Sequence, residues 1–149
     1  MRIRNTVGKT GVAILALASQ LFAGGPFTLL IGNPEASPEA RKMNAVLTVR
    51  SGGCSDPAKS EVTASAIGVV NGERRTIPLK MVALSEPGTF GIARQWPKEG
   101  RWVIQFVGHN GSQVATTLLT AGPQGIDRDS AKTETRQASA GEVEAMLRK

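Results

Sequence analysis

The stretch Arg101-Trp102-Val103-Ile104-Gln105-Phe106-Val107 decides the fold class of this chain of 149 residues. Every second residue is large and apolar, so Trp102, Ile104 and Phe106 share one face of an extended chain. This alternation predicts a β-strand with one buried face. The pair Asn110-Gly111 follows, which is typical of a two-residue hairpin loop, and residues 114–119 supply the returning strand.

Similar strand patterns precede this hairpin along the chain. A second hairpin signal, Asn71-Gly72, joins two of them, and Pro78 within the return favours an edge position for that strand. Strands of this length with regular turns predict an immunoglobulin-like antiparallel β-sandwich of about seven strands over residues 24–120. The further candidate strands are residues 27–31, 45–50, 61–70, 75–79, 81–84 and 89–96.

Two short helices complete the expected fold. Ser37 followed by Pro38 is a typical helix start, and we expect a short helix that ends near Met43. Residues 121–138 contain no aromatic residue and one large aliphatic residue, so we expect a mobile tail there. Residues 139–148 match a short amphipathic helix that Ser139 would cap, and such a helix needs a partner surface to be stable.

The N-terminus has the features of an export signal. Three basic residues precede an apolar run at 12–18, and small residues follow it, so residues 1–23 are predicted to be a cleaved signal peptide. The alternative is an uncleaved anchor that extends to about residue 32. In both cases the remaining chain is periplasmic or secreted, and only the anchor would contact a membrane.

The composition limits the partners of the exported part. The net charge of +6 includes Arg2, Arg4 and Lys9 of the signal, and the remainder carries +3 without a dense basic cluster. Nucleic-acid binding requires clustered Lys and Arg, so it is not expected. Cys54 is the only cysteine, which excludes a disulfide within the chain.

Residues 87–104 carry a resemblance to a known family. Their pattern is a glycine, an aromatic residue and a strand, then a short turn and Gly100-Arg101-Trp102-Val103-Ile104. It resembles the last hairpin of the FixH and YtkA-like group of small exported immunoglobulin-like domains. The resemblance covers about 20 of the 149 residues, and it implies a sandwich at the cell envelope with a role in metal handling, often of copper.

Cys54 and His109 are the candidate metal ligands. Cys54 lies in a glycine-containing loop between two strands, and His109 is the only histidine and lies beside a predicted hairpin tip. Met43 and Met81 are the other soft ligand candidates, and such a set favours Cu(I). The alternative for each residue is structural: a loop cysteine packed on the rim of the sandwich, and an exposed histidine without a role.

The sequence contains no motif that points to an enzyme. It has no Gly-x-Ser-x-Gly, His-Glu-x-x-His or phosphate-binding glycine loop, and Asp127 and Asp129 fall in the expected tail. We therefore expect an exported, non-catalytic binding or accessory module with a protein partner in the cell envelope and no cofactor. The alternative is an envelope copper-binding domain that uses Cys54 and His109.

Overall fold

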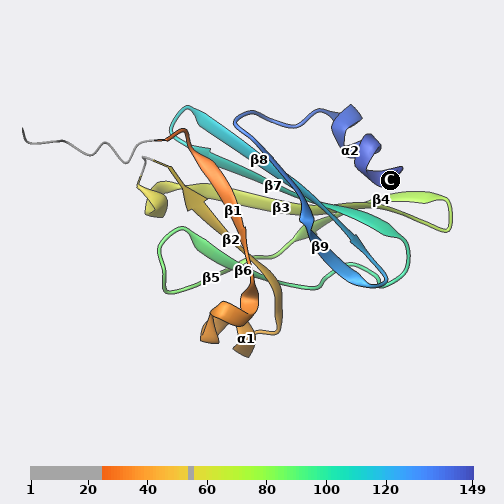
Figure 1. Ribbon diagram of the computed structural model, residues 1–149, viewed down its shortest axis with the longest axis horizontal. Helices are drawn as coiled ribbons and strands as arrows, with labels where there is room; N and C mark the ends of the chain where they lie inside the picture. The colour runs from red at the N-terminus through yellow and green to blue at the C-terminus, as the bar shows by residue number, and fades with distance from the viewer. Residues whose placement is uncertain (1–24, 54–55) are drawn as a thin grey trace, which may run out of the picture.

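The computed structural model describes residues 25–53 and 56–149, which form two packed antiparallel sheets (Figure 1). The predicted signal segment and Cys54 lie outside the described residues. The first sheet, sheet A, has the strand order β1-β2-β6-β5. Its strands are β1 (Thr28–Gly32), β2 (Ala45–Gly52), β5 (Val82–Ala83) and β6 (Thr89–Ala93).

The second sheet, sheet B, contains the longer strands and has the order β4-β3-β7-β8-β9. Its strands are β3 (Glu61–Val70), β4 (Glu73–Leu79), β7 (Arg101–Asn110), β8 (Gln113–Gly122) and β9 (Gly125–Glu134). When β4 is lettered C′, as in variable-type immunoglobulin domains, the order of sheet A is A-B-E-D, which is the order of one sheet of these domains. The predicted immunoglobulin-like antiparallel sandwich is confirmed, with nine described strands where the sequence predicts about seven.

Two of the turns confirm the hairpin signals. Val70 pairs with Glu73, and the two loop residues between them have positive φ angles of 51° at Asn71 and 79° at Gly72. This conformation is why an Asn-Gly pair is favoured there. In the second hairpin Asn110 pairs with Gln113, so the loop is Gly111-Ser112, one residue later than the Asn110-Gly111 pair suggests.

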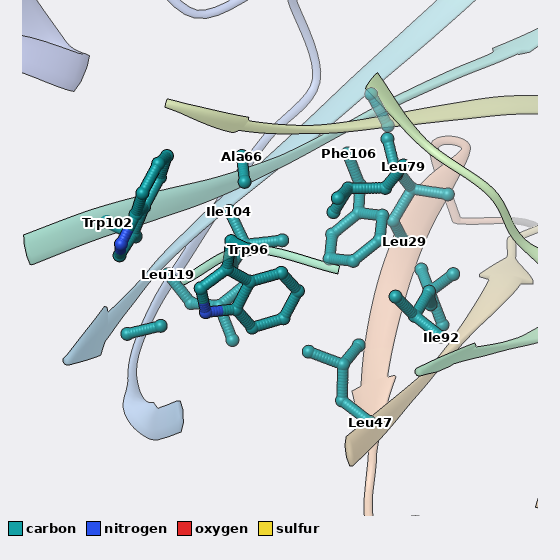
Figure 2. Packing of buried hydrophobic residues seen from close by; sticks show 14 of the residues in the cluster. Leu29, Leu47, Ala66, Leu79, Ile92, Trp96, Trp102, Ile104, Phe106 and Leu119 are labelled. Carbon is teal, nitrogen blue, oxygen red and sulfur yellow. The ribbon is translucent and has the colours of Figure 1, made fainter. Parts of the chain in front are cut away.

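The main core lies between the sheets and contains the predicted face of β7. Trp102, Ile104 and Phe106 are fully buried, and Figure 2 shows them packed with residues from both sheets. Trp96, which follows β6, also points into this core and is buried. Neither tryptophan is therefore part of an exposed aromatic surface.

A strand occupies much of the segment that the sequence predicts to be a mobile tail. β9 pairs with β8 and extends sheet B, so residues 125–134 are part of the sandwich. The expectation failed because an edge strand is held largely by main-chain hydrogen bonds and needs few large apolar side chains. Only Ile126 and Ala131 of β9 pack against the main core.

A wide bulge interrupts the pairing of β8 with β9. Thr120 pairs with Asp127, but Leu118 pairs with Lys132, so the four residues 128–131 of β9 lie opposite the single residue Leu119 of β8. The Ser130 hydroxyl accepts a hydrogen bond from the Thr120 backbone N–H at 2.8 Å, and it donates one to the Asp127 carbonyl oxygen at 2.6 Å. A side chain thus replaces the main-chain partner that the bulge removes.

The two α-helices lie on opposite sides of the sandwich (Figure 1). α1 (Pro38–Lys42) lies beside sheet A, and the Ser37 hydroxyl caps it by accepting the Ala40 N–H at 3.2 Å, as predicted. It is followed by β2, and two short 3-10 helices, η1 (Pro34–Ala36) and η2 (Pro57–Lys59), occupy neighbouring loops. Among the described residues no helix is long and apolar enough to cross a membrane.

The C-terminal helix α2 (Ala140–Leu147) packs on the outer face of sheet B. Val143 and Met146 bury their side chains in a second cluster, separate from the main core, with residues of β3, β7 and β8. The sheet residues of this cluster are Ile67, Val103 and Leu118. The partner surface that so short a helix requires is therefore provided by its own domain.

The start of α2 has the predicted capping box. Glu142 accepts a hydrogen bond from the Ser139 N–H at 2.7 Å, while the Ser139 hydroxyl accepts one from the Glu142 N–H at 3.2 Å. Arg136 binds the same carboxylate through both guanidinium nitrogens, at 2.9 and 2.7 Å. These bonds lower the pKa of Glu142 to about 2, and the Arg136 hydrogen bonds are the largest cause.

Candidate functional site

Each edge of the two sheets carries a feature that opposes the addition of another strand. β4 contains Pro78 and the charged residues 73–75, β5 has only two residues, and β9 carries the bulge. The edge at β1 is occupied by sheet B, because the Leu29 carbonyl oxygen accepts hydrogen bonds from the hydroxyls of Thr117 and Thr133. Proteins use such features to prevent edge-to-edge pairing, so a binding site is better sought on the faces of the sandwich.

A groove of about 660 Å³ crosses the outer face of sheet A. One wall is formed by η1 and the start of α1, and the other by the loop at residues 84–86. β1, β2 and β6 supply the floor. We refer to this groove as the sheet-A groove, and the three strands line it with Leu30, Ile31, Gly32, Thr48, Arg50 and Thr89.

Two threonines form the buried part of this floor. Thr48 and Thr89 are each 8% exposed, and both lie on the outer face because their strand neighbours Leu47, Val49 and Phe90 face the core. The Thr89 hydroxyl has no hydrogen-bond partner within residues 25–53 and 56–149. A buried hydroxyl without a partner is uncommon in proteins and calls for an explanation.

Leu30 provides an apolar contact at the rim of the sheet-A groove. Its side chain is 44% exposed, although it belongs to a regular strand. Leu84, on the opposite wall, is half-buried. The groove therefore combines apolar side chains on its sides with hydroxyls on its floor.

Charged side chains define one end of the groove. Arg50 pairs with Glu86 at 3.3 Å across the floor, and both side chains are exposed. Glu39 of α1 accepts hydrogen bonds from the N–H of Ser85 at 3.0 Å and from its hydroxyl at 2.8 Å. These bonds to Ser85 lower the pKa of Glu39, and they tie the two walls of the groove together.

A second groove of about 790 Å³ lies at the bulge of β9. We call it the bulge groove, and it is bounded by the end of β8, the bulge and the C-terminal end of α2. Asp127 and Asp129 line it, so they belong to an ordered strand and not to a tail. The Asp127 carboxylate accepts a hydrogen bond from the Asp129 N–H at 3.1 Å, which is a local turn contact.

The described metal-ligand candidates are not brought together. His109 is exposed near the end of β7, where it lies opposite Glu61 of β3 and Val114 of β8. Met43 packs over Gly91 on sheet A, and Met81 packs against the main core. Within the described ranges there is no group of three His, Cys, Asp or Glu residues placed to hold a metal ion.

The sequence alone did not reveal the sheet-A groove. Thr48 and Thr89 appear as ordinary polar residues in strands, and Glu39 appears only as an acidic residue in the first turn of a helix. The only indication in the sequence was that the two threonines are polar residues at outward-facing positions of strands. The pairing of β2 with β6, which places Thr48 beside Gly91 and Arg50 beside Thr89, could not be deduced from local patterns.

Fold and groove together define an immunoglobulin-like β-sandwich with a hydroxyl-floored groove on one sheet. Comparison of the chain with protein-family models, with characterised proteins and with solved structures finds no match.

Proposed function

We propose that this chain is an exported, non-catalytic binding module of the cell envelope that holds an extended segment of a partner protein in the sheet-A groove. The observation that carries the proposal is the buried Thr89 hydroxyl on the groove floor, which has no hydrogen-bond partner among the residues that the structure describes. An extended peptide presents an N–H or C=O group at every residue, so it can supply the hydrogen bond that this hydroxyl lacks.

The remaining groove residues fit the same kind of partner. Leu30 and Leu84 offer apolar contacts to side chains, while Arg50 and Glu86 can exchange their mutual ion pair for charged groups of a partner. An exposed pair of this kind contributes little to stability, so exchanging it costs little. Export rests on the N-terminal pattern of the sequence.

A photo-crosslinking experiment in the native host tests this binding mode. A photoreactive benzoylphenylalanine replaces Leu30 in the groove or, as a control, Val69, which is exposed on sheet B. We expect a discrete crosslinked protein from position 30 and none from position 69. Crosslinks from both positions, or from position 69 alone, would contradict the proposal.

A charge-reversal pair makes the test specific to the groove. Arg50→Glu should weaken the crosslink from position 30 at least ~10-fold, because the new glutamate repels the partner's charged group that Arg50 attracts. Arg75→Glu is the matched control, since Arg75 is equally exposed and also pairs with a glutamate, Glu73, at 3.6 Å on sheet B. Fractionation of the same cells, with sequencing of the mature N-terminus, tests export separately.

A further inference from the structure

A small cavity lies beneath α2, apart from the sheet-A groove. It measures about 150 Å³ and is bounded by β8, β9, α2 and Ala138 before α2. Leu118, Ala138, Ala145 and Met146 give it apolar walls, and the two alanines leave space that larger side chains would fill. A cavity of about this volume is large enough for a single benzene ring, and polar or charged residues form the other half of its lining.

Thr116 of β8 gives this cavity a polar group. Its side chain is 1% exposed, and its hydroxyl finds no hydrogen-bond partner in the described part of the chain. The residue lines the cavity and faces outward from sheet B, as Leu118 does two residues later. A ligand with one hydroxyl group could both donate to and accept from this side chain.

The charges around the cavity favour a neutral ligand. Lys132 carries one positive charge, while Glu134 and Glu142 carry negative charges. Arg136 is bound to Glu142 and offsets its charge. The surroundings are thus nearly balanced, so neither an anion nor a cation gains a net attraction.

The cavity also has a route to solvent. It shares Lys132 and Met146 with the open bulge groove, so the two spaces adjoin between α2 and β9. Because the cluster beneath α2 is separate from the main core, a small outward movement of α2 widens this route without opening the sandwich. We propose that the cavity beneath α2 binds a small neutral alcohol or phenol, whose hydroxyl pairs with Thr116.

Phenol is the probe for this site. We expect its titration into the ¹⁵N-labelled full chain to give saturable NMR shifts at the amides of Thr116, Leu118 and α2. Thr116→Val, which keeps the side-chain shape, should weaken phenol binding about 10-fold. Thr63→Val, the same change on the outer face of β3, should leave binding unchanged. Non-saturating shifts, shifts elsewhere, or equal binding by both variants would overturn the proposal.

A cavity-filling variant tests the proposal without removing the hydroxyl. Ala138→Leu places a larger side chain at the cavity wall, and phenol binding should be lost. Ala140→Leu is the control, because Ala140 is exposed and does not line the cavity. If Ala138→Leu still binds phenol, then phenol binds at another site, and this result would also overturn the proposal. None of these outcomes bears on the sheet-A groove.

Discussion

Trp102 packs its indole ring directly across Gly68, the residue opposite it on the neighbouring strand β3. A Cβ atom at position 68 would overlap the six-membered part of the ring and would lie 2.8 Å from the Arg101 carbonyl oxygen. The glycine therefore lets the largest side chain of the core lie flat against the sheet. From the sequence alone, Gly68 appears only as a glycine within a strand, where it lowers the stability of the strand.

Gly68→Ala should consequently destabilise the fold. The added methyl group forces the Trp102 ring out of its position, and overpacking of this kind costs about 2 kcal/mol of unfolding free energy. Urea denaturation measures the loss. Gly122→Ala is the control, because a Cβ there meets nothing within 4 Å, and it should change stability by less than about 0.5 kcal/mol. Equal effects of the two variants would contradict the packing argument.

The two tryptophans should respond differently to replacement by phenylalanine. Trp102 donates its indole N–H to the Glu99 carbonyl oxygen at 2.9 Å, whereas the buried N–H of Trp96 finds no acceptor within the described residues. Trp102→Phe should therefore cost about 1 kcal/mol more than Trp96→Phe, because only the first loses a hydrogen bond. Thermal and urea unfolding of the two variants gives the difference, and an equal loss would argue against it.

The bulge of β9 should depend on one hydroxyl. Ser130→Ala removes the acceptor for the Thr120 N–H, and we expect a loss of about 1 kcal/mol. Amide exchange should become faster at Thr120 in particular. Ser112→Ala, in the exposed β7–β8 loop, should affect neither quantity. An unchanged exchange rate at Thr120 in Ser130→Ala would show that the bulge is held in another way.

Acid should weaken the attachment of α2 progressively as the pH falls from 4.5 to about 2. Glu142 has an ordinary pKa of 4.5 and a pKa of about 2 in the folded chain, so the unfolded chain binds its proton first. The stabilisation is complete above pH 4.5 and disappears as the pH falls through about 2. Arg136→Met should remove the largest part of it, because the hydrogen bond from the Ser139 N–H remains, so wild type and variant should differ at pH 7 and converge near pH 2.

Urea unfolding at pH 7, 4 and 2 measures that convergence. Because Arg136 and Glu142 are exposed, solvent keeps the difference small. Arg75→Met, which breaks the ion pair between Arg75 and Glu73 within β4, serves as the control. A difference between wild type and Arg136→Met that is constant with pH would exclude Glu142 as its source.

The copper alternative makes a separate prediction. If Cys54 is a ligand, Cys54→Ser should lower the affinity for Cu(I) at least ~10-fold in a competition titration, because the soft thiolate is lost. His109→Ala should lower it as well if the histidine completes the site. Met43→Leu should have no effect, since Met43 packs on sheet A over Gly91. Equal Cu(I) affinity of wild type and Cys54→Ser would exclude this alternative.

Local patterns were sufficient to predict most of the strands. The alternation around Trp102, Ile104 and Phe106 and the loop Asn71-Gly72 specify strand and turn by the geometry of a few neighbouring residues. β9 was missed because its stability comes from pairing with β8 and from the Ser130 hydroxyl, which are contacts outside its own sequence. The apolar content of a segment indicates how much side-chain surface it buries, and an edge strand such as β9 buries little.

The candidate sites depend even more on distant contacts. The sheet-A groove requires Thr48 and Thr89 to meet on neighbouring strands and Glu39 to reach Ser85, 46 residues away. The cavity beneath α2 requires α2 to pack back against β8. The order of the strands in the sheets determines these contacts, so they cannot be predicted from residue spacing along the chain.

α2 follows β3, β7 and β8 in the chain, and this order has a consequence during synthesis. The ribosome makes these strands first, so Ile67, Val103 and Leu118 have no cover until α2 emerges. Until β9 is made, β8 also presents an open edge. The nascent chain is thus prone to aggregation until α2 has formed, and a chaperone that shields this face would be needed only until α2 closes over it.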